Sequence, residues 1–120
     1  MKILIIDDDA TFVNGMEKLL ELRTIPTATA TNVTEAKELL KREEISLICT
    51  DWDLCDGTGL EVLQYATEKN VPVILLTGHD EDSYKEKAMS LGVARYYIKG
   101  QGNYKDIINE LITLLEQQSF

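Results

Sequence analysis

Cysteine is scarce in this sequence, and basic residues are fewer than acidic ones. Two cysteines are too few for a disulfide framework, and Cys49 lies in an apolar run, so we expect a buried free thiol and a cytoplasmic protein. Twelve basic residues face 21 acidic ones, and the resulting net charge of −9 opposes direct binding to nucleic acid or to an anionic membrane.

Long apolar stretches are absent as well, since no run approaches the roughly 20 residues that a membrane-spanning helix needs. Three aspartates interrupt the apolar start after Ile6, so we do not expect a secretory signal peptide. What is present, 44% hydrophobic and 28% charged residues, is typical of a globular protein rather than a disordered one. We therefore expect one domain over residues 1–120.

Short continuous apolar runs alternate along the chain with amphipathic stretches. Continuous apolar residues are typical of strands that are covered on both faces, as in a parallel sheet. The runs predict strands at residues 3–6, 47–49, 73–76 and 96–98, and a weaker candidate at 27–30 that we expect at an edge.

Between these runs, apolar residues recur at the spacing of a helix. Asn32 or Thr31 is expected to cap the second helix, Asn103 to open the last, and Gly92 to follow the fourth. The five stripes are Phe12, Val13, Met16, Leu19 and Leu20; Val33, Ala36, Leu39 and Leu40; Leu60, Leu63 and Ala66 or Thr67; Tyr84, Ala88 and Leu91; and Tyr104, Ile107, Ile108, Leu111 and Leu115. Five strand–helix repeats predict a three-layer α/β domain with right-handed crossovers.

Polar residues follow four of the five apolar runs, at the point where each run ends. They are Asp7 and Asp8 after the first, Asp51 after the third, Thr77 after the fourth and Lys99 after the fifth. Because open α/β sheets bind ligands at the carboxyl ends of their strands, we expect these side chains to meet at one edge.

This set of groups points to phosphoryl chemistry at a magnesium ion. Crowded carboxylates either keep a proton or bind a cation, and without neighbouring histidine or cysteine they favour Mg²⁺ over zinc. Lys99 would supply a charge and Thr77 a hydroxyl donor for a phosphate, while Asp51 would act as the nucleophile.

Each residue taken alone also has an ordinary interpretation. Asp8 or Asp9 could cap the first helix, and Thr77 could be a turn residue. Lys99 could be a solvated lysine and Asp51 a loop aspartate without chemistry. The combination, with one group at each of four strand ends, is more specific than any member.

Four blocks of the sequence resemble the signature blocks of bacterial response-regulator receiver domains. They are residues 3–9, residues 50–54 with Gly59, residues 75–78 and residues 97–99, and the resemblance extends over the whole chain. It implies a doubly wound, flavodoxin-like (βα)5 fold with a parallel five-stranded sheet in the order 2-1-3-4-5.

The resemblance also implies a role for each matching residue. Asp51 would accept the phosphoryl group, while Asp7, Asp8, Asp51 and the backbone carbonyl of Asp53 would hold Mg²⁺. The phosphoryl contacts would come from Thr77 and Lys99. Tyr96 matches the aromatic switch residue, whose ring turns inward when Thr77 moves toward the phosphate, although it could simply pack against the fourth helix.

Two departures from the family pattern concern the switch and the hydrolytic water. Gly100 replaces the usual proline that follows a cis bond, and because a non-proline cis bond costs about 3 kcal/mol, we expect a trans bond and a looser loop at 100–102. Asp53 and His79 flank the expected approach of water, so we expect them to modulate dephosphorylation. The ordinary interpretation of His79 is a solvated surface histidine.

The main alternative is an aspartate-nucleophile phosphohydrolase of the haloacid dehalogenase type. Asp51-Trp52-Asp53 has the D-x-D pattern of that family, with Asp53 as general acid. That motif normally follows the first strand and needs a larger core or cap, and it leaves Asp7 and Asp8 unexplained.

The resemblance further implies a signalling phosphoacceptor that is not an enzyme but assists its own phosphorylation and dephosphorylation. The donor would be a sensor histidine kinase or a phosphotransfer protein. The fourth helix, fifth strand and fifth helix would form the signalling face, which could also serve as a dimer contact. A free-standing regulator, a phosphorelay shuttle and a piece of a longer protein with an output domain all stay open.

Overall fold

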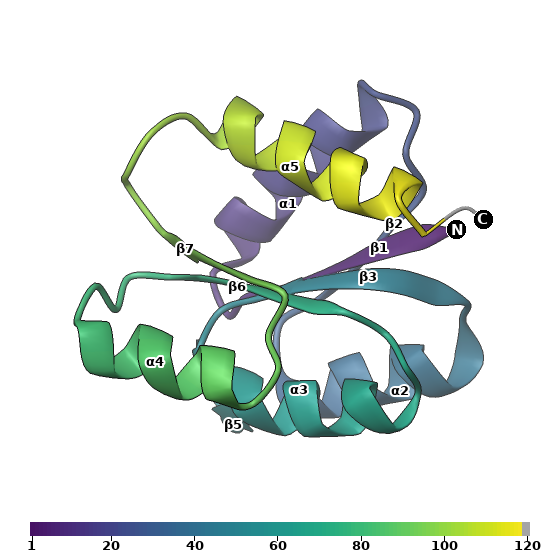
Figure 1. Ribbon diagram of the computed structural model, residues 1–120. Coiled ribbons are helices and arrows are strands. Elements are labelled where there is room, and N and C mark those ends of the chain that lie inside the picture. Colours follow the sequence, from purple (N-terminus) through teal and green to yellow (C-terminus); the bar gives the residue numbers. More distant parts are fainter. Residues whose placement is uncertain (119–120) are drawn as a thin grey trace.

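A computed structural model describes residues 1–118, and residues 119 and 120 fall outside the described part. It has three layers, with α1 and α5 on one face of a central sheet and α2, α3 and α4 on the other (Figure 1). The elements of the main sheet and its helices are β1 (Lys2–Ile6), α1 (Ala10–Glu21), β2 (Thr27–Ala30), α2 (Val33–Arg42), β3 (Ile45–Thr50), α3 (Gly59–Glu68), β6 (Val73–Thr77), α4 (Asp82–Ser90), β7 (Arg95–Ile98) and α5 (Tyr104–Glu116).

The sheet is parallel throughout, and its strand order is β2-β1-β3-β6-β7. Counting only these five strands, the order is the predicted 2-1-3-4-5, and β2 lies at an edge with the predicted bounds. β3 is longer than predicted, because Ile45 and Thr50 also pair with β1. Two short strands, β4 (Asp53–Leu54) and β5 (Gly57–Thr58), form a separate antiparallel hairpin that the apolar pattern did not predict.

The helices α1, α2 and α5 begin at side-chain caps that the sequence predicts. Asp9 accepts hydrogen bonds from the amides of residues 11 and 12 at α1, Asn32 from the amide of residue 35 at α2, and Asn103 from that of residue 105 at α5. Gly92 follows α4 with a φ of 98°, a left-handed conformation that favours glycine. The predicted fourth stripe is wrong at Leu91, which lies just past the helix with half its surface exposed.

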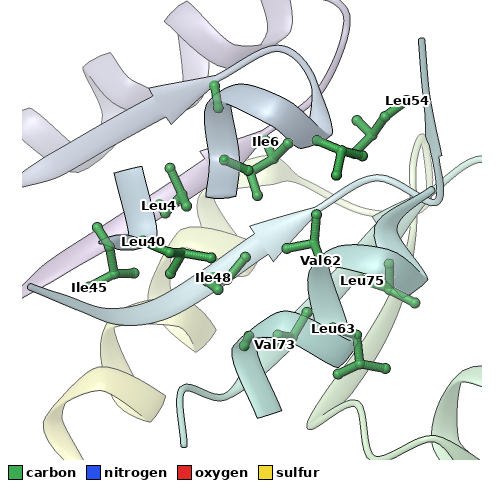
Figure 2. Close-up of a cluster of buried hydrophobic side chains, with 14 of the residues drawn as sticks. Leu4, Ile6, Leu40, Ile45, Ile48, Leu54, Val62, Leu63, Val73 and Leu75 are labelled. Carbon is green, nitrogen blue, oxygen red and sulfur yellow. The ribbon is translucent and has the colours of Figure 1, made fainter. Parts of the chain in front are cut away.

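Two apolar clusters, one on each face of the sheet, form the core. Side chains that alternate along a strand enter opposite clusters, so Leu4 and Ile6 pack under α2 and α3, while Ile3 and Ile5 pack under α1 and α5. Figure 2 shows the first cluster, where side chains of the sheet meet those of α3. Because both faces are covered, the inner strands β1 and β6 carry the uninterrupted apolar runs at residues 3–6 and 73–76. Cys49 lies in the second cluster as a buried free thiol, as predicted.

Within residues 1–118, no helix is both long enough and apolar enough to cross a membrane.

Candidate functional site

The polar residues predicted to follow the strands do meet at the carboxyl edge of the sheet. Asp7 follows β1, Asp51 follows β3, Thr77 ends β6 and Lys99 follows β7. Backbone pairing continues just past the strands, since the amide of Asp51 donates to Ile6 at 3.0 Å and that of Lys99 to Thr77 at 2.8 Å. The sheet itself therefore sets the spacing of these side chains.

Lys99 bridges two carboxylates at this edge. Its Nζ donates to Asp7 Oδ2 at 2.5 Å and to Asp51 Oδ2 at 2.9 Å. The remaining oxygens are also held, because Asp7 Oδ1 accepts from the amide of Asp9 at 2.9 Å and Asp51 Oδ1 from that of Trp52 at 2.6 Å. Both carboxylates therefore have fixed orientations, and the Asp51 side chain stays 13% exposed and open to a reactant.

Burial and pairing act differently on the two ends of this bridge. Burial raises the pKa of Asp7, and the hydrogen bond from Lys99 offsets this only in part. Burial also lowers the pKa of Lys99, but the hydrogen bonds to Asp7 and Asp51 outweigh it and leave that pKa raised overall. Lys99 is consequently a permanent cation at neutral pH.

Asp8 completes an acidic cluster around this bridge. Asp7, Asp8 and Asp51 each offer a carboxylate oxygen, and these three oxygens lie within 4.8 Å of one another. Three carboxylates against one ammonium leave an excess of negative charge that favours a bound cation. A donor set of oxygens alone fits Mg²⁺ or Ca²⁺, with exposed Asp8 on the solvent side where metal-bound waters would remain.

Thr77 and Tyr96 both bind the backbone of one residue, His79. The buried Thr77 Oγ1 accepts from the His79 amide at 3.4 Å, and the Tyr96 hydroxyl donates to the His79 carbonyl at 2.7 Å. Tyr96 is partly buried and packs against the same core cluster as Tyr84 of α4, as its interpretation as a packing residue predicts. The two residues expected to switch are thus linked through the loop between β6 and α4.

His79 is not the solvated surface histidine that its ordinary interpretation predicts. Its ring stacks on Tyr84 with centroids 4.1 Å apart and planes 1° from parallel, and its Nε2 lies 2.5 Å from Asp53 Oδ2. Trp52 meets both rings edge-on, at 6.1 Å from His79 and 4.8 Å from Tyr84. Neither Trp52 nor Tyr84 was expected to take part in the site, although the position of the single tryptophan directly after Asp51 was an available signal.

Asp53 lies beside the acidic cluster rather than in it. Its exposed carboxylate contacts His79, and the cluster of carboxylates consists of Asp7, Asp8 and Asp51. The side chain thus has a contact outside the cluster, and the ligand role of the carbonyl stays a prediction.

The loop after Lys99 agrees with the predicted bond geometry. Every peptide bond in residues 1–118 is trans, including Lys99–Gly100. Gly100 and Gly102 both have a φ of 82°, which glycine adopts at little cost. Lys99 itself is held by two carboxylates, and the looser loop stays a prediction.

The parallel sheet in this order, with paired carboxylates and a lysine at its carboxyl edge, defines a class of phosphoacceptor signalling domains. The chain belongs to the response regulator receiver domain family, whose model matches residues 3–112. This membership confirms the resemblance and leaves the phosphohydrolase alternative without support. The domain is a receiver of two-component response regulators.

Individual relatives agree with this assignment. Response regulator protein PilR of Pseudomonas aeruginosa is 34% identical over 100 residues, which are 82% of this chain and 22% of that protein. A two-component response regulator from Clostridium difficile has a TM-score of 0.91 at 26% identity, over 100% of this chain and 99% of that one. A response regulator from Burkholderia pseudomallei, solved with a phosphorylated aspartic acid, calcium ion and citrate, has a TM-score of 0.83 at 25% identity, over 98% of this chain and 69% of that one.

Proposed function

We propose that Asp51 is the phosphoacceptor of this receiver domain, and that residues 1–120 form that domain. The observation that supports this most is the position of its carboxylate, which shares Lys99 with buried Asp7 and lies within 4.8 Å of Asp8. The Burkholderia pseudomallei relative, which carries a phosphorylated aspartic acid and a calcium ion, supports the same chemistry.

Mg²⁺ is the proposed cofactor, held by Asp7, Asp8, Asp51 and the backbone carbonyl of Asp53. When bound, the ion would neutralise the repulsion between the carboxylates and an incoming phosphoryl group. One Asp51 oxygen would attack phosphorus, and the donor group would leave with the electrons of the broken bond. The hydrogen bond from the amide of Trp52 to Asp51 Oδ1 keeps the carboxylate oriented, which leaves Oδ2 as the attacking atom.

Lys99 and Thr77 are the proposed contacts to the transferred group. Phosphorylation of Oδ2 would displace the Lys99 ammonium from that oxygen onto a phosphoryl oxygen, while its hydrogen bond to Asp7 keeps it in place. Thr77 would give up its contact with the His79 amide to donate to the same group.

That movement supports a switch through Tyr96. Because Thr77 and Tyr96 bind the amide and carbonyl of the same residue, a shift of the His79 backbone would be felt at the Tyr96 hydroxyl. The proposed output face is α4, β7 and α5, which could also form a dimer. A receiver domain dimer of NtrC4 is known in a beryllofluoride-activated form, at 22% identity.

Asp53 and His79 are the proposed modulators of phosphoryl lifetime. The Asp53 carboxylate belongs to a residue two positions after Asp51 and contacts the His79 ring, and both side chains keep exposed surface, 68% for Asp53 and 28% for His79. We expect the acyl-phosphate half-life to differ between the wild type and Asp53→Asn, which removes the negative charge at constant shape. Equal half-lives would refute this role.

The proposed phosphodonor is a sensor histidine kinase or a phosphotransfer protein in the cytoplasm, and the target is a protein or an output domain rather than nucleic acid or membrane. The chain spans 22% of PilR, so a longer protein could supply such an output domain. The net charge of −9 argues against direct binding of nucleic acid by this domain.

The test of the proposed function is labelling by a small phosphodonor such as radiolabelled acetyl phosphate. The wild type and Asp53→Asn should incorporate label with Mg²⁺ and lose the reaction with EDTA, while Asp51→Asn should not react. Asp53→Asn is the matched control because it removes an equivalent carboxylate from the same segment. Magnesium-dependent label on Asp51→Asn would contradict the assignment.

A further inference from the structure

The hairpin between Asp51 and α3 is held at its tip by an unusual contact. Asp53 pairs with Thr58 and Leu54 with Gly57, so the turn consists of Cys55 and Asp56. Asp56 is exposed and lies three residues from Asp53, the residue whose carbonyl is the proposed fourth ligand of the cation.

The Asp56 carboxylate reaches from this turn to the beginning of α2. Its Oδ1 accepts from the amide of Val33 at 2.7 Å, and its Oδ2 accepts from the amide of Thr34 at 3.0 Å and from the Thr34 hydroxyl at 2.8 Å. These hydrogen bonds lower the pKa of Asp56, and the bond from the Val33 amide has the largest effect. The carboxylate is therefore charged at neutral pH.

α2 already has a cap of its own, and the two caps divide the free amides between them. Asn32, the residue before the helix, accepts from the amide of Glu35 at 2.8 Å, while Asp56 takes the amides of the first two helical residues. The local cap comes from the helix's own segment, whereas Asp56 comes from a loop 22 residues or more away in sequence. Asp56 therefore ties the hairpin to the helix by hydrogen bonds.

The other end of the hairpin segment is equally fixed. The amide of Gly59 donates to the carbonyl of Trp52 at 2.7 Å, and Leu54 is 7% exposed, with its side chain at the margin of the core cluster (Figure 2). Because β1 lies between β2 and β3, the bond from Asp56 to α2 joins the loops on either side of Asp7 and Asp8. The segment that carries Asp53, two residues after Asp51 of the acidic cluster, is therefore held at both ends.

We propose that Asp56 is a positioning residue for the metal site, which sets the Asp53 carbonyl at its distance from the three clustered aspartates by fixing the hairpin to α2. This inference rests on the proposed function, since it takes the Asp53 carbonyl as a ligand of Mg²⁺. It adds a residue outside the cluster to the determinants of magnesium affinity.

The test is the magnesium dissociation constant of the unphosphorylated protein, measured by the fluorescence of Trp52, the single tryptophan, and checked by calorimetry. Asp56→Ala should bind Mg²⁺ about 10-fold more weakly, as is typical when an outer partner of a metal ligand is lost. Asp56→Asn retains an acceptor for the Val33 amide, so its magnesium affinity should lie between those of the wild type and Asp56→Ala.

Asn32→Ala is the matched control, because it removes the other cap of the same helix without touching the hairpin. It should lower thermal stability as Asp56→Ala does but leave the magnesium affinity at the wild-type value. Wild-type affinity in Asp56→Ala, or an equal loss in Asn32→Ala, would show that Asp56 only stabilises α2 and would overturn the proposal.

Asp8→Asn separates this proposal from the proposed function. Weaker binding in Asp8→Asn with wild-type affinity in Asp56→Ala overturns the positioning role alone. Unchanged magnesium binding in Asp8→Asn would contradict the assignment of the cation site itself, and the positioning role of Asp56 would fall with it.

Discussion

Replacing Gly59 with alanine should destabilise this protein by an amount that can be worked out from the structure. A Cβ on Gly59 would lie 2.3 Å from the carbonyl oxygen of Asp51 and 3.2 Å from a methyl carbon of Leu75. The first distance is roughly 1 Å shorter than van der Waals contact, and its partner is backbone that cannot rotate away. The amide of Asp51 is also bound to Ile6, so α3 must retreat instead.

We expect Gly59→Ala to lower the free energy of unfolding by about 2–3 kcal/mol, the upper part of the range for overpacked buried sites. At about 4 °C per kcal/mol for a domain of this size, the melting temperature should fall by about 8–12 °C. Because the clash is with Asp51 itself, magnesium-dependent phosphorylation of the folded fraction should slow as well.

Gly15→Ala is the matched control with the opposite expected sign. Gly15 is exposed inside α1, and a Cβ there would meet nothing within 4 Å. Alanine is the better helix former by about 0.5–1 kcal/mol, so this variant should melt higher than the wild type. Urea and thermal unfolding followed by circular dichroism measure both. A Gly59→Ala protein as stable as the wild type, or shifts of the same sign in both variants, would refute the reasoning.

Three further variants or probes test other parts of the structure. Burial makes Asp7 bind its proton more tightly in the folded than in the unfolded chain, so its ionisation above pH 3.8 costs stability; Asp7→Asn should melt higher at pH 7 while losing magnesium affinity. Tyr96→Phe removes the hydrogen bond to the His79 carbonyl and should lower stability by about 0.5–1.5 kcal/mol in urea titrations; no change would contradict that contact. Burial raises the pKa of Cys49 to about 12, whereas Cys55 is exposed, so a thiol reagent should modify one cysteine in native protein and both in urea; rapid native modification of both would contradict the burial.

The strand ends were predictable from sequence because of how parallel sheets are built. A continuous apolar run ends where the strand leaves the core, and parallel strands all end at the same edge, so Asp7, Asp51, Thr77 and Lys99 had to come together. The types of these residues already indicated phosphoryl chemistry at a metal ion, and the family resemblance then implied a role for each residue.

The contacts around the site were not predictable, because they depend on the paths of loops. β4 and β5 have two residues each, too few to show a periodic pattern. The stacking of His79 on Tyr84 depends on how the chain turns between β6 and α4. Asp56 binds α2 across more than 20 residues of sequence, and no local pattern indicates such a hydrogen bond.

The most direct test of the central claim is the location of the phosphoryl group. Phosphorylated protein can be reduced with borohydride, which converts an aspartyl phosphate to homoserine, and the modified residue is then identified by peptide mass spectrometry. The account predicts homoserine at position 51 in the wild type and none in Asp51→Asn. Homoserine at Asp53 or Asp8 instead, or a stable phosphoryl group on His79, would contradict it.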